Sequence, residues 1–274
     1  MPELPEVETV VRRLQSSLLD KKIQKVQILT PKIVRPASGR FTKELQGAII
    51  REIRRKGKFI LMDLDPEGTL VLHLKMTGQV LLVNKSEPID QYTHLIFSFF
   101  SSAQQMRYRD VRKFGFFDLV SGLEAGIPPY LNKVGPDPFE LSPKEFFQLI
   151  HKHNKTIKGL LLDQSVVSGL GNIYVDESLY LTGMHPQIKA SSLSPGQAKN
   201  LFRNIKKILL HAIRHQGSTL RNFRSPDGSA GGYQRFHRVY RRGGQPCPLC
   251  QTPIQRIIVA GRGTHYCASC QKPQ

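Results

Sequence analysis

The sequence predicts an α+β protein: an antiparallel β-sandwich with an N-terminal helix, a helical part after it, and a small metal-binding tail. Three observations lead to this prediction. Apolar and polar residues alternate in short segments between residues 58 and 111, apolar residues recur at helical spacing beyond residue 140, and all four cysteines fall between residues 247 and 270. The chain therefore reads as a strand-rich part, a helical part and a cysteine-containing part.

The first helix is predicted to begin at Pro5, because proline is favoured at the first helical position and Glu6 and Glu8 suit the positive end of a helix. The residues before it offer a second interpretation. If Met1 is removed, Pro2 presents a secondary α-amine beside the carboxyl group of Glu3. An α-amine has a pKa of about 8, against about 10.4 for lysine, so more of it is unprotonated at neutral pH. Pro2 is thus a candidate nucleophile and Glu3 a candidate acid, unless the stretch is only a helix start.

The following segments predict strands. Thr69 to Met76 alternates, with Leu70, Leu72, Leu74 and Met76 on the inward row, and Gly78 follows in a turn. Segments 58–64, 79–83, 94–100 and 105–111 are also typical of strands, and together they favour a sandwich. Glycines and prolines at 122–138 predict a linker. We expect domains at 1–125, 140–233 and 234–274, with a linker at 126–139.

Beyond the linker the period is helical. Helices are predicted from Ser142-Pro143, across Lys155–Leu162, and from Ser194-Pro195 to Gly217, followed by a polar loop up to residue 232.

Composition limits the partners. The formal net charge is +19 and the pI is near 10.0, so a polyanion, and nucleic acid first, is the expected partner. No apolar run of 18 residues occurs, and the N-terminus is acidic where a secretory signal would be basic. We therefore expect a soluble cytoplasmic protein with no membrane partner.

The cysteines form two Cys-x2-Cys pairs, Cys247 with Cys250 and Cys267 with Cys270. Four thiolates in two close pairs fit one tetrahedral Zn²⁺ of the closed, structural kind, and a redox dithiol is the alternative. No acidic residue follows Asp227, which indicates a phosphate-binding surface or a solvated basic face. In that tail Arg262 lies between Gly261 and Gly263 at an expected hairpin turn.

Three more sites stand out. Asn172 follows Gly169-Leu170-Gly171 at a helix start, which is typical of an anion site but also of a plain linker. Lys58 ends a basic run at a strand start, where a solvated lysine is the ordinary interpretation. Arg112 and Phe114 would point the same way in an extended chain, as insertion into a base stack requires, although they could also belong to a half-buried strand edge.

Several motifs together resemble bacterial formamidopyrimidine-DNA glycosylase, a DNA glycosylase and DNA-(apurinic or apyrimidinic site) lyase. They run from one end of the chain to the other: MPELPEVET at 1–9, RKGKF at 55–59, HLKMTG at 73–78, DVRKFG at 110–115, GLGNIYVDE at 169–177 and AGRGTHYC at 260–267. The resemblance implies a catalytic N-terminal domain, a helix-two-turns-helix DNA-binding domain with a lesion loop near 218–221, and a zinc finger.

The resemblance also implies roles. Pro2 would attack C1′ of an oxidised purine nucleotide and form a Schiff base, Glu3 would transfer protons, and Lys58 and Arg262 would assist β- and δ-elimination. The flipped base would leave a gap for Met76, Arg112 and Phe114, with Arg112 facing the orphaned cytosine. The remaining implied DNA contacts are His94, Lys155, Lys158 and Asn172. The implied partner is damaged duplex DNA, bound by a monomer.

Three positions depart from the family pattern: Arg241 after Tyr240, Gln216 before Gly217, and Tyr92 where histidine is frequent. They concern loop geometry and lesion preference. Leu4 and the continuation Val7-Glu8-Thr9 favour the purine branch over endonuclease VIII-like enzymes, which act on oxidised pyrimidines. A zinc-dependent DNA-binding protein without catalysis is the alternative from another class.

Overall fold

The computed structural model describes residues 1–121 and 128–273, and its contacts divide the chain into two compact units. Unit 1 comprises Met1–Asn132 and His215–Gly232, and unit 2 comprises Lys133–Arg214 and Tyr233–Gln274. Segment 215–232 therefore packs with the N-terminal residues although it follows the helices of unit 2. The predicted domain boundary at residue 125, and the first part of the predicted linker, lie outside the described residues. Among the described residues, none of the helices combines the length and the hydrophobicity of a membrane-spanning segment.

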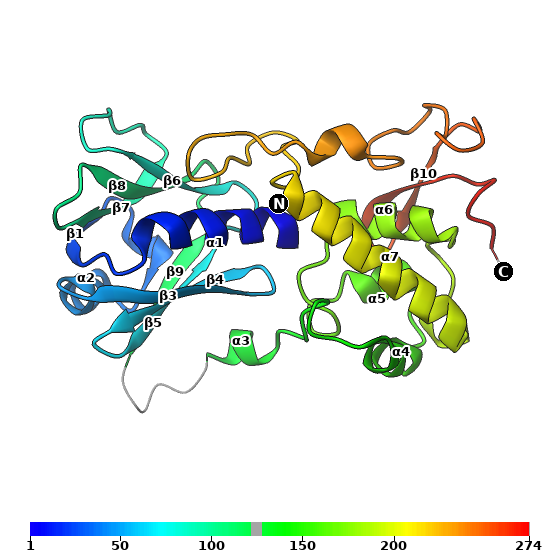
Figure 1. Ribbon diagram of the computed structural model, residues 1–274, viewed down its shortest axis with the longest axis horizontal. Coiled ribbons are helices and arrows are strands. Elements are labelled where there is room, and N and C mark those ends of the chain that lie inside the picture. Colours follow the sequence, from blue (N-terminus) through cyan, green and yellow to red (C-terminus); the bar gives the residue numbers. More distant parts are fainter. Residues whose placement is uncertain (122–127, 274) are drawn as a thin grey trace. The chain divides into compact units, whose positions relative to one another are not determined.

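Unit 1 is a two-sheet sandwich with helix α1 (Leu4–Leu18) packed along it (Figure 1). One sheet has the order β1-β7-β8-β6 and the other β2-β9-β5-β4-β3. Only the pairing of β2 with β9 is parallel among these strands. The strands are β1 (Ile23–Ile28), β2 (Val34–Arg35), β3 (Ile49–Lys56), β4 (Phe59–Asp65), β5 (Gly68–His73), β6 (Gly78–Asn84), β7 (Thr93–Phe99), β8 (Gln104–Asp110) and β9 (Phe116–Ser121). Two short helices, η1 (Pro31–Ile33) and α2 (Ser38–Leu45), lie between β1 and β3, and α3 (Pro129–Asn132) follows later.

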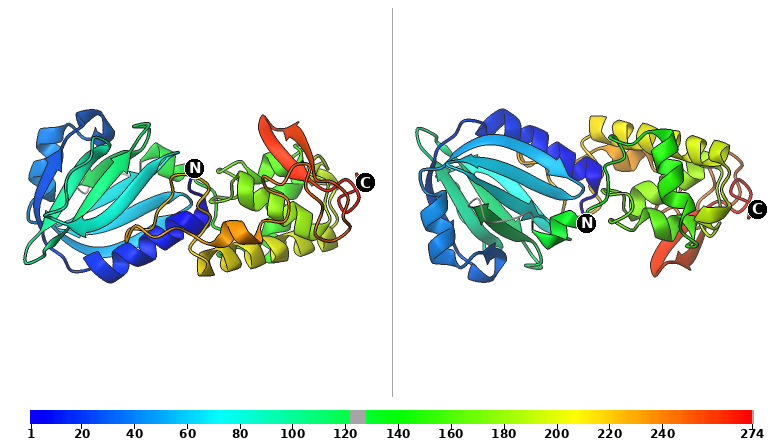
Figure 2. Two further views of the ribbon diagram at one scale, coloured as in Figure 1. Left: turned by 90° about the horizontal axis from the view of Figure 1, so that it is seen from above. Right: turned by 90° about the horizontal axis from the view of Figure 1, so that it is seen from below.

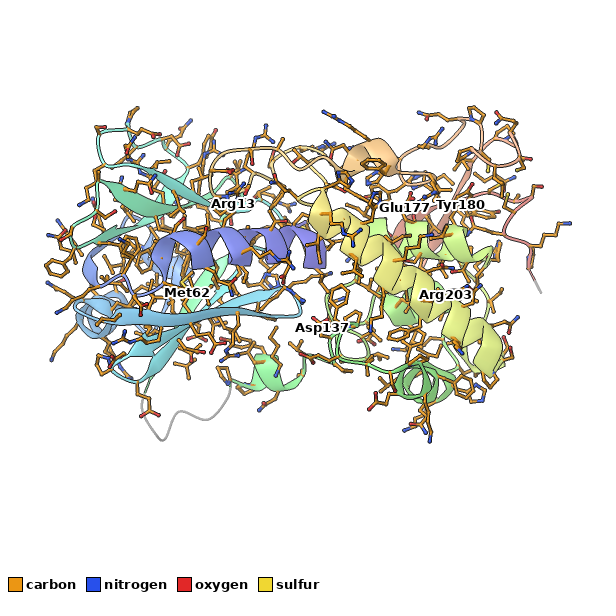
Figure 3. The ribbon with its side chains drawn as sticks, in the orientation of Figure 1. Arg13, Met62, Asp137, Glu177, Tyr180 and Arg203 are labelled. Atoms are coloured by element: carbon orange, nitrogen blue, oxygen red, sulfur yellow. The ribbon has the colours of Figure 1, made fainter. Side chains whose placement is uncertain are left out.

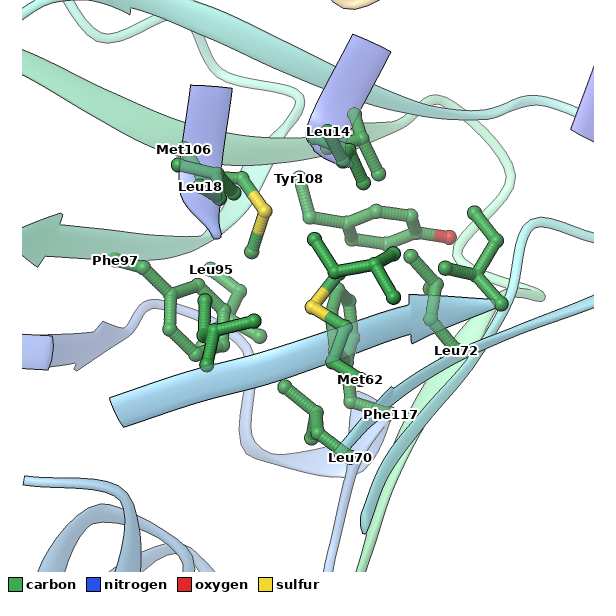
Figure 4. Close-up of a cluster of buried hydrophobic side chains, with 14 of the residues drawn as sticks. Leu14, Leu18, Met62, Leu70, Leu72, Leu95, Phe97, Met106, Tyr108 and Phe117 are labelled. Atoms are coloured by element: carbon green, nitrogen blue, oxygen red, sulfur yellow. The ribbon is translucent and has the colours of Figure 1, made fainter. Parts of the chain in front are cut away.

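The core of unit 1 lies between its two sheets and α1 (Figure 4). Leu14 and Leu18 of α1 meet Met62 and Leu72 of one sheet and Phe97 of the other, all at most 4% exposed. The predicted inward residues Leu70, Leu72 and Leu74 are indeed buried. Val71 points to the other face and is buried too, because it packs with Leu61 of β4 and Leu131 of α3. Both faces of this sheet are therefore covered at β5.

Two details of the strand prediction are wrong. Strand β5 ends at His73, the backbone N–H of Gly78 donates to the carbonyl of Leu74 at 3.0 Å, and Met76 lies in the resulting turn with 43% of its surface exposed. Met76 is thus not the last member of an inward row. Residues 111–115 are also a turn rather than extended chain, since β8 ends at Asp110 and Lys113 has a φ of 57°.

Unit 2 contains the predicted helices and the predicted hairpin. Helix α4 (Pro143–His151) begins with a capping box in which Ser142 and Glu145 exchange hydrogen bonds. Ser194 and Gln197 form the same arrangement before α7 (Pro195–Arg214). The other elements are α5 (Ile157–Leu161), α6 (Asn172–Thr182), η2 (Ala190–Ser192), η3 (Tyr233–Phe236), β10 (Gln255–Val259) and β11 (Arg262–Tyr266). The hairpin of β10 and β11 projects from the side of unit 2 that faces away from α7 (Figure 2). The predicted fold class is thus confirmed in its sandwich, helical part and hairpin.

Candidate functional site

The N-terminus is a buried, charged site within unit 1. Pro2, Glu3 and Glu6 are buried, and Glu6 Oε2 accepts a hydrogen bond from the backbone N–H of Glu3 at 2.8 Å. Burial lowers the pKa of the α-amine, the carboxylates of Glu3 and Glu6 oppose this shift, and the positive charges of Lys58 and Arg112 add to it. In the described chain this amine belongs to Met1, so the nitrogen of Pro2 is an amide. Burial therefore favours the neutral form of the amine of Met1.

Segment 215–232 is attached to this site through Glu6. The second carboxylate oxygen of Glu6, Oε1, accepts a hydrogen bond from the backbone N–H of Ser218 at 2.6 Å. The preceding Gly217 has a φ of 72°, and a Cβ atom at this position would lie 2.5 Å from Glu6 Oε1. Glycine is therefore required at Gly217 by backbone conformation and by space.

Lys58 is only 6% exposed, just before β4, and its charge acts on His73, which the sequence did not predict as a site residue. Phe59 pairs with His73 across the strands, and the two rings meet edge to face at 4.5 Å. Burial, with the nearby charges of Lys75 and Lys58, lowers the pKa of His73 to about 3. His73 is therefore a neutral imidazole beside Lys58, and its Nδ1 accepts from the backbone N–H of Lys75 at 2.9 Å. Its one sequence signal was its place in the HLKMTG motif.

The candidate wedge residues occupy two turns of unit 1. Met76, Arg112 and Phe114 are all exposed, Phe114 by 53%. The guanidinium of Arg112 lies over the ring of Phe114 at 4.5 Å, so the predicted pair of a cation and an aromatic ring is present although the backbone is not extended. These three side chains are free to meet a partner from outside the unit.

His94 is buried in unit 1 and bonded to its neighbours. It is 2% exposed, its Nε2 lies 2.8 Å from the carbonyl oxygen of Asp110, and its Nδ1 lies 3.0 Å from Thr30 Oγ1. Both ring nitrogens are therefore engaged inside unit 1, next to the turn that carries Arg112.

In unit 2, an ion pair and two hydrogen bonds connect the first half of α6 with α5 and with the hairpin strand β11. Lys158 is fully buried, and its Nζ contacts Asp176 Oδ1 at 2.5 Å. Asp176 Oδ2 accepts from the backbone N–H of His265 at 2.9 Å. Asn172 donates through Nδ2 to the carbonyl of Gly263 at 2.8 Å, and its buried Oδ1 has no hydrogen-bond partner among the described residues. By contrast, Lys155 is exposed and pairs with Asp163 at 3.1 Å. Lys158 thus holds α5, α6 and β11 together, and Lys155 faces solvent.

An open, basic hollow of about 480 Å³ lies beside this junction in unit 2. Arg262 begins β11 next to it and is exposed, directly after the left-handed turn at Ala260 and Gly261. Tyr240, Arg256 and His265 were not proposed as site residues from the sequence. The hollow is lined by Asn172, Tyr240, Arg241, Gly243, Arg256, Gly263 and His265. Its charge and its backbone turn suit a phosphate group.

Residues 238–240, of which Tyr240 lines the hollow, are held by Glu177, labelled on α6 in Figure 3. The buried carboxylate of Glu177 accepts hydrogen bonds from the backbone N–H groups of Arg238, Val239 and Tyr240 at 2.8 to 3.0 Å. The chain is therefore held on α6 just before it enters the cysteine-containing tail.

The four cysteines fit one zinc ion. Their sulfur atoms all lie within 4.8 Å of one another, with Cys247 to Cys270 at 3.9 Å and Cys250 to Cys267 at 3.4 Å. A tetrahedral Zn²⁺ with Zn–S bonds of about 2.3 Å places its sulfurs roughly 3.8 Å apart. The hydroxyl of Tyr180, on α6, lies 3.2 Å from Cys247 Sγ. Four cysteine ligands leave no open position, so the predicted zinc site is structural.

The sequence is similar to known proteins along its whole length. The family model described as "Formamidopyrimidine-DNA glycosylase N-terminal domain" matches residues 1–117, the "H2TH domain" of the same enzyme matches residues 134–224, and "Zinc finger found in FPG and IleRS" matches residues 244–273. Formamidopyrimidine-DNA glycosylase of Bacillus subtilis is 45% identical over 276 residues, which cover 99% of both chains. The same enzyme from Latilactobacillus sakei is 42% identical and is covered to 98%.

Solved structures of DNA complexes of Lactococcus lactis Fpg are also similar to this chain. The Lactococcus lactis FPG mutant G226P, in complex with DNA containing Fapy-dG, has a TM-score of 0.92 and 38% identity over 99% of this chain and 100% of its own. Lactococcus lactis Fpg in complex with DNA containing an abasic site has a TM-score of 0.91 at the same identity and coverage.

Proposed function

Because the chain belongs to the formamidopyrimidine-DNA glycosylase family, we propose that it removes oxidised purines from duplex DNA and then cleaves the abasic strand by β,δ-elimination. The family consists of DNA glycosylases with AP lyase activity, and this chain is an enzyme of base excision repair. The proposed substrates are 8-oxoguanine and formamidopyrimidines. The observation that carries the proposal is the arrangement at the start of the chain, where Pro2, Glu3 and Glu6 are buried and Glu6 accepts hydrogen bonds from the backbone of both Glu3 and Ser218.

The proposed chemistry begins once Met1 is removed. The nitrogen of Pro2 attacks C1′, the bond from C1′ to the base breaks, and the base leaves with a proton. Glu3 protonates the ring oxygen as the sugar opens, which leaves an iminium ion on Pro2. This cation makes a C2′ proton acidic, so the 3′ phosphate is expelled by β-elimination and the 5′ phosphate by δ-elimination. Lys58 is the proposed proton donor associated with β-elimination, and Arg262 is proposed to assist δ-elimination and to hold a phosphate.

Proposed DNA contacts follow from exposure. Asn172 lines the basic hollow, Arg262 is exposed next to it, and Lys155 faces solvent. These three residues are therefore proposed to bind phosphates of the damaged strand. Lys158 and His94 act indirectly, since both are buried and engaged with protein atoms. A target base inside a duplex must be flipped out before its C1′ can be attacked. Met76, Arg112 and Phe114 then fill the gap, with Arg112 facing the orphaned cytosine.

We also propose that the protein acts as a monomer in the cytoplasm, associated with the nucleoid through DNA. The proposed functional division is a catalytic part at 1–125, a DNA-binding helical part at 140–233 and a zinc finger at 234–274.

Intact mass spectrometry combined with borohydride trapping tests this function. Protein without Met1 should form a covalent product with an 8-oxoguanine duplex, and a trappable species that keeps Met1 would exclude Pro2 as the nucleophile. Faster removal of thymine glycol than of 8-oxoguanine would assign the chain to the pyrimidine branch. Tight, salt-sensitive binding with no covalent product would indicate a DNA-binding protein without catalysis.

A further inference from the structure

One buried carboxylate holds both turns that carry the candidate wedge residues. Asp110, the last residue of β8, is 0% exposed. Its Oδ1 accepts hydrogen bonds from the hydroxyl of Thr77 and from the backbone N–H of Arg112, the latter at 3.1 Å. Its Oδ2 accepts from the backbone N–H groups of Phe114 and Gly115, at 3.0 and 2.9 Å. Thr77 follows Met76 directly, so a single side chain links the turn of Met76 to the turn of Arg112 and Phe114.

The fifth donor to Asp110 is a buried tyrosine that fills the space between the turns. The hydroxyl of Tyr108 donates to Asp110 Oδ2 at 3.0 Å. A Cβ atom at Gly115 would lie 1.7 Å from this hydroxyl oxygen, and one at Gly78 would lie 2.6 Å from it. Both turns thus come close to Tyr108 only because they carry glycine there.

The backbone of Asp110 is fixed as well. Its N–H donates to the carbonyl of Tyr92 at 2.9 Å, and its carbonyl oxygen lies 2.8 Å from His94 Nε2. His94 in turn reaches Thr30. Five donors share the roughly four lone-pair sites of this carboxylate, two on Oδ1 and three on Oδ2, so neither oxygen can be replaced by an NH₂ group without the loss of hydrogen bonds. Asp110 therefore has little freedom to move, and little capacity for any other ligand.

We propose that Asp110 is a positioning residue that couples the two turns and thereby determines how strongly the enzyme distinguishes the base opposite the lesion. The inference rests on the proposed function, in which Arg112 faces the orphaned base. A guanidinium recognises a base edge through hydrogen bonds of fixed direction, so its backbone must be held in place. Asp110 supplies this support through the N–H of Arg112 itself and through Thr77, whose Oγ1 also lies 3.2 Å from that N–H.

The decisive variant is Asp110→Asn, which replaces one acceptor oxygen by an NH₂ group. In one amide orientation this group faces the N–H of Arg112, and in the other it faces those of Phe114 and Gly115. The measurement is the single-turnover rate on 8-oxoguanine opposite cytosine divided by the rate opposite adenine. We expect this ratio to fall by about tenfold, the lower range of what a directional contact to a base contributes. The rate on a single-stranded abasic oligonucleotide, which has no opposite base, should fall less than the duplex rate.

Asp63→Asn is the matched control. Asp63, on β4, also accepts hydrogen bonds within unit 1, from Thr69 Oγ1 at 2.6 Å and from Arg54 Nε at 2.8 Å. These bonds involve neither the two wedge turns nor the residues that hold Asp110, so the ratio should stay at the wild-type value. Thr77→Val is a second test variant: it removes the hydroxyl link to the Met76 turn and leaves the other four donors to Asp110. Its ratio should fall in the same direction by a smaller factor, and it decides the question if Asp110→Asn does not fold.

Arg112→Ala separates this inference from the function on which it rests. If Arg112→Ala leaves the ratio unchanged, the role proposed for Arg112 is wrong, and the role of Asp110 falls with it. If Arg112→Ala lowers the ratio but Asp110→Asn or Thr77→Val, folded and with zinc bound, keeps it, only the role of Asp110 is overturned. Combining Asp110→Asn with Arg112→Ala should lower the ratio no further than Arg112→Ala alone.

Discussion

Glu6 and Ser218 are joined by a hydrogen bond of 2.6 Å although 212 positions separate them in the sequence. The second oxygen of Glu6 holds the backbone of Glu3, so one carboxylate connects the start of α1 with the segment that follows α7. Any displacement of segment 215–232 therefore acts on the residues beside the N-terminal amine. The bond lies wholly within unit 1.

Two glycines of this segment form a matched pair for a test. Gly217 and Gly228 have φ values of 72° and 82°, but a Cβ atom at Gly228 would meet nothing within 4 Å, whereas one at Gly217 would lie 2.5 Å from Glu6 Oε1. Both alanine variants bear the left-handed strain of about 1 kcal/mol. Only Gly217→Ala should slow borohydride-trapped product formation and make segment 215–232 sensitive to limited proteolysis. Equal behaviour of the two variants would show that the contact with Glu6 is unimportant.

The zinc site should depend on a hydroxyl outside its ligand set. Tyr180→Phe removes the contact of 3.2 Å with Cys247 Sγ. Such supporting contacts typically change metal affinity about 10- to 100-fold, so zinc should be lost to a chelator at a correspondingly lower concentration. Tyr130→Phe, which removes a hydroxyl bonded to Asp118 in unit 1 at 2.6 Å, is the control and should retain zinc. Metal content by mass spectrometry gives the comparison, with one zinc per chain expected in the wild type.

His73 should make stability depend on pH. Its pKa is about 3 in the folded protein, against about 6.5 in an unfolded chain, because the buried imidazole is held neutral. The unfolded chain therefore binds a proton first, so the contribution is complete above about pH 6.5 and is lost as the pH falls towards 3. The slope in this window is at most about 1.4 kcal/mol per pH unit.

Urea unfolding at pH 7 and pH 5 checks this prediction. The wild type should lose more stability between the two values than His73→Gln, which has no imidazole at this position. The exposed His151 is the control position, and His151→Gln should follow the wild type. Parallel losses in the wild type and His73→Gln would contradict the assignment.

Glu177 should stabilise residues 238–240, which lead into the basic hollow at Tyr240. Glu177→Gln places an NH₂ group against backbone donors from residues 238–240, and an unmet buried hydrogen bond costs about 1–3 kcal/mol. We expect a loss of this size in the free energy of unfolding and weaker binding to an abasic-site duplex. Glu145→Gln, at an exposed helix start, should change neither quantity appreciably. Unchanged DNA affinity in Glu177→Gln would show that the position of residues 238–240 does not affect DNA binding.

Local patterns were sufficient to predict much of this protein. The family, the fold class and the zinc site are confirmed, because helix caps such as Ser142 with Glu145 and close cysteine pairs are local in sequence. Long-range relationships were not predictable in this way. Alternation placed Met76 inward, but a turn begins at Leu74, and nothing in the periodicity indicated that His94 is buried or that Glu6 would meet Ser218. Such contacts depend on how sheets and segments pack, which a single stretch of sequence does not encode.

Unit 1 is built from two separate segments of the chain, and this affects the order in which it can fold during synthesis. The residues up to Asn132 leave the ribosome well before segment 215–232, yet both belong to the same compact unit. The nascent sandwich therefore cannot form the hydrogen bond between Glu6 and Ser218 until the helices up to α7 have been synthesised. The start of α1 consequently acquires its final surroundings late in translation, after most of the chain has been completed.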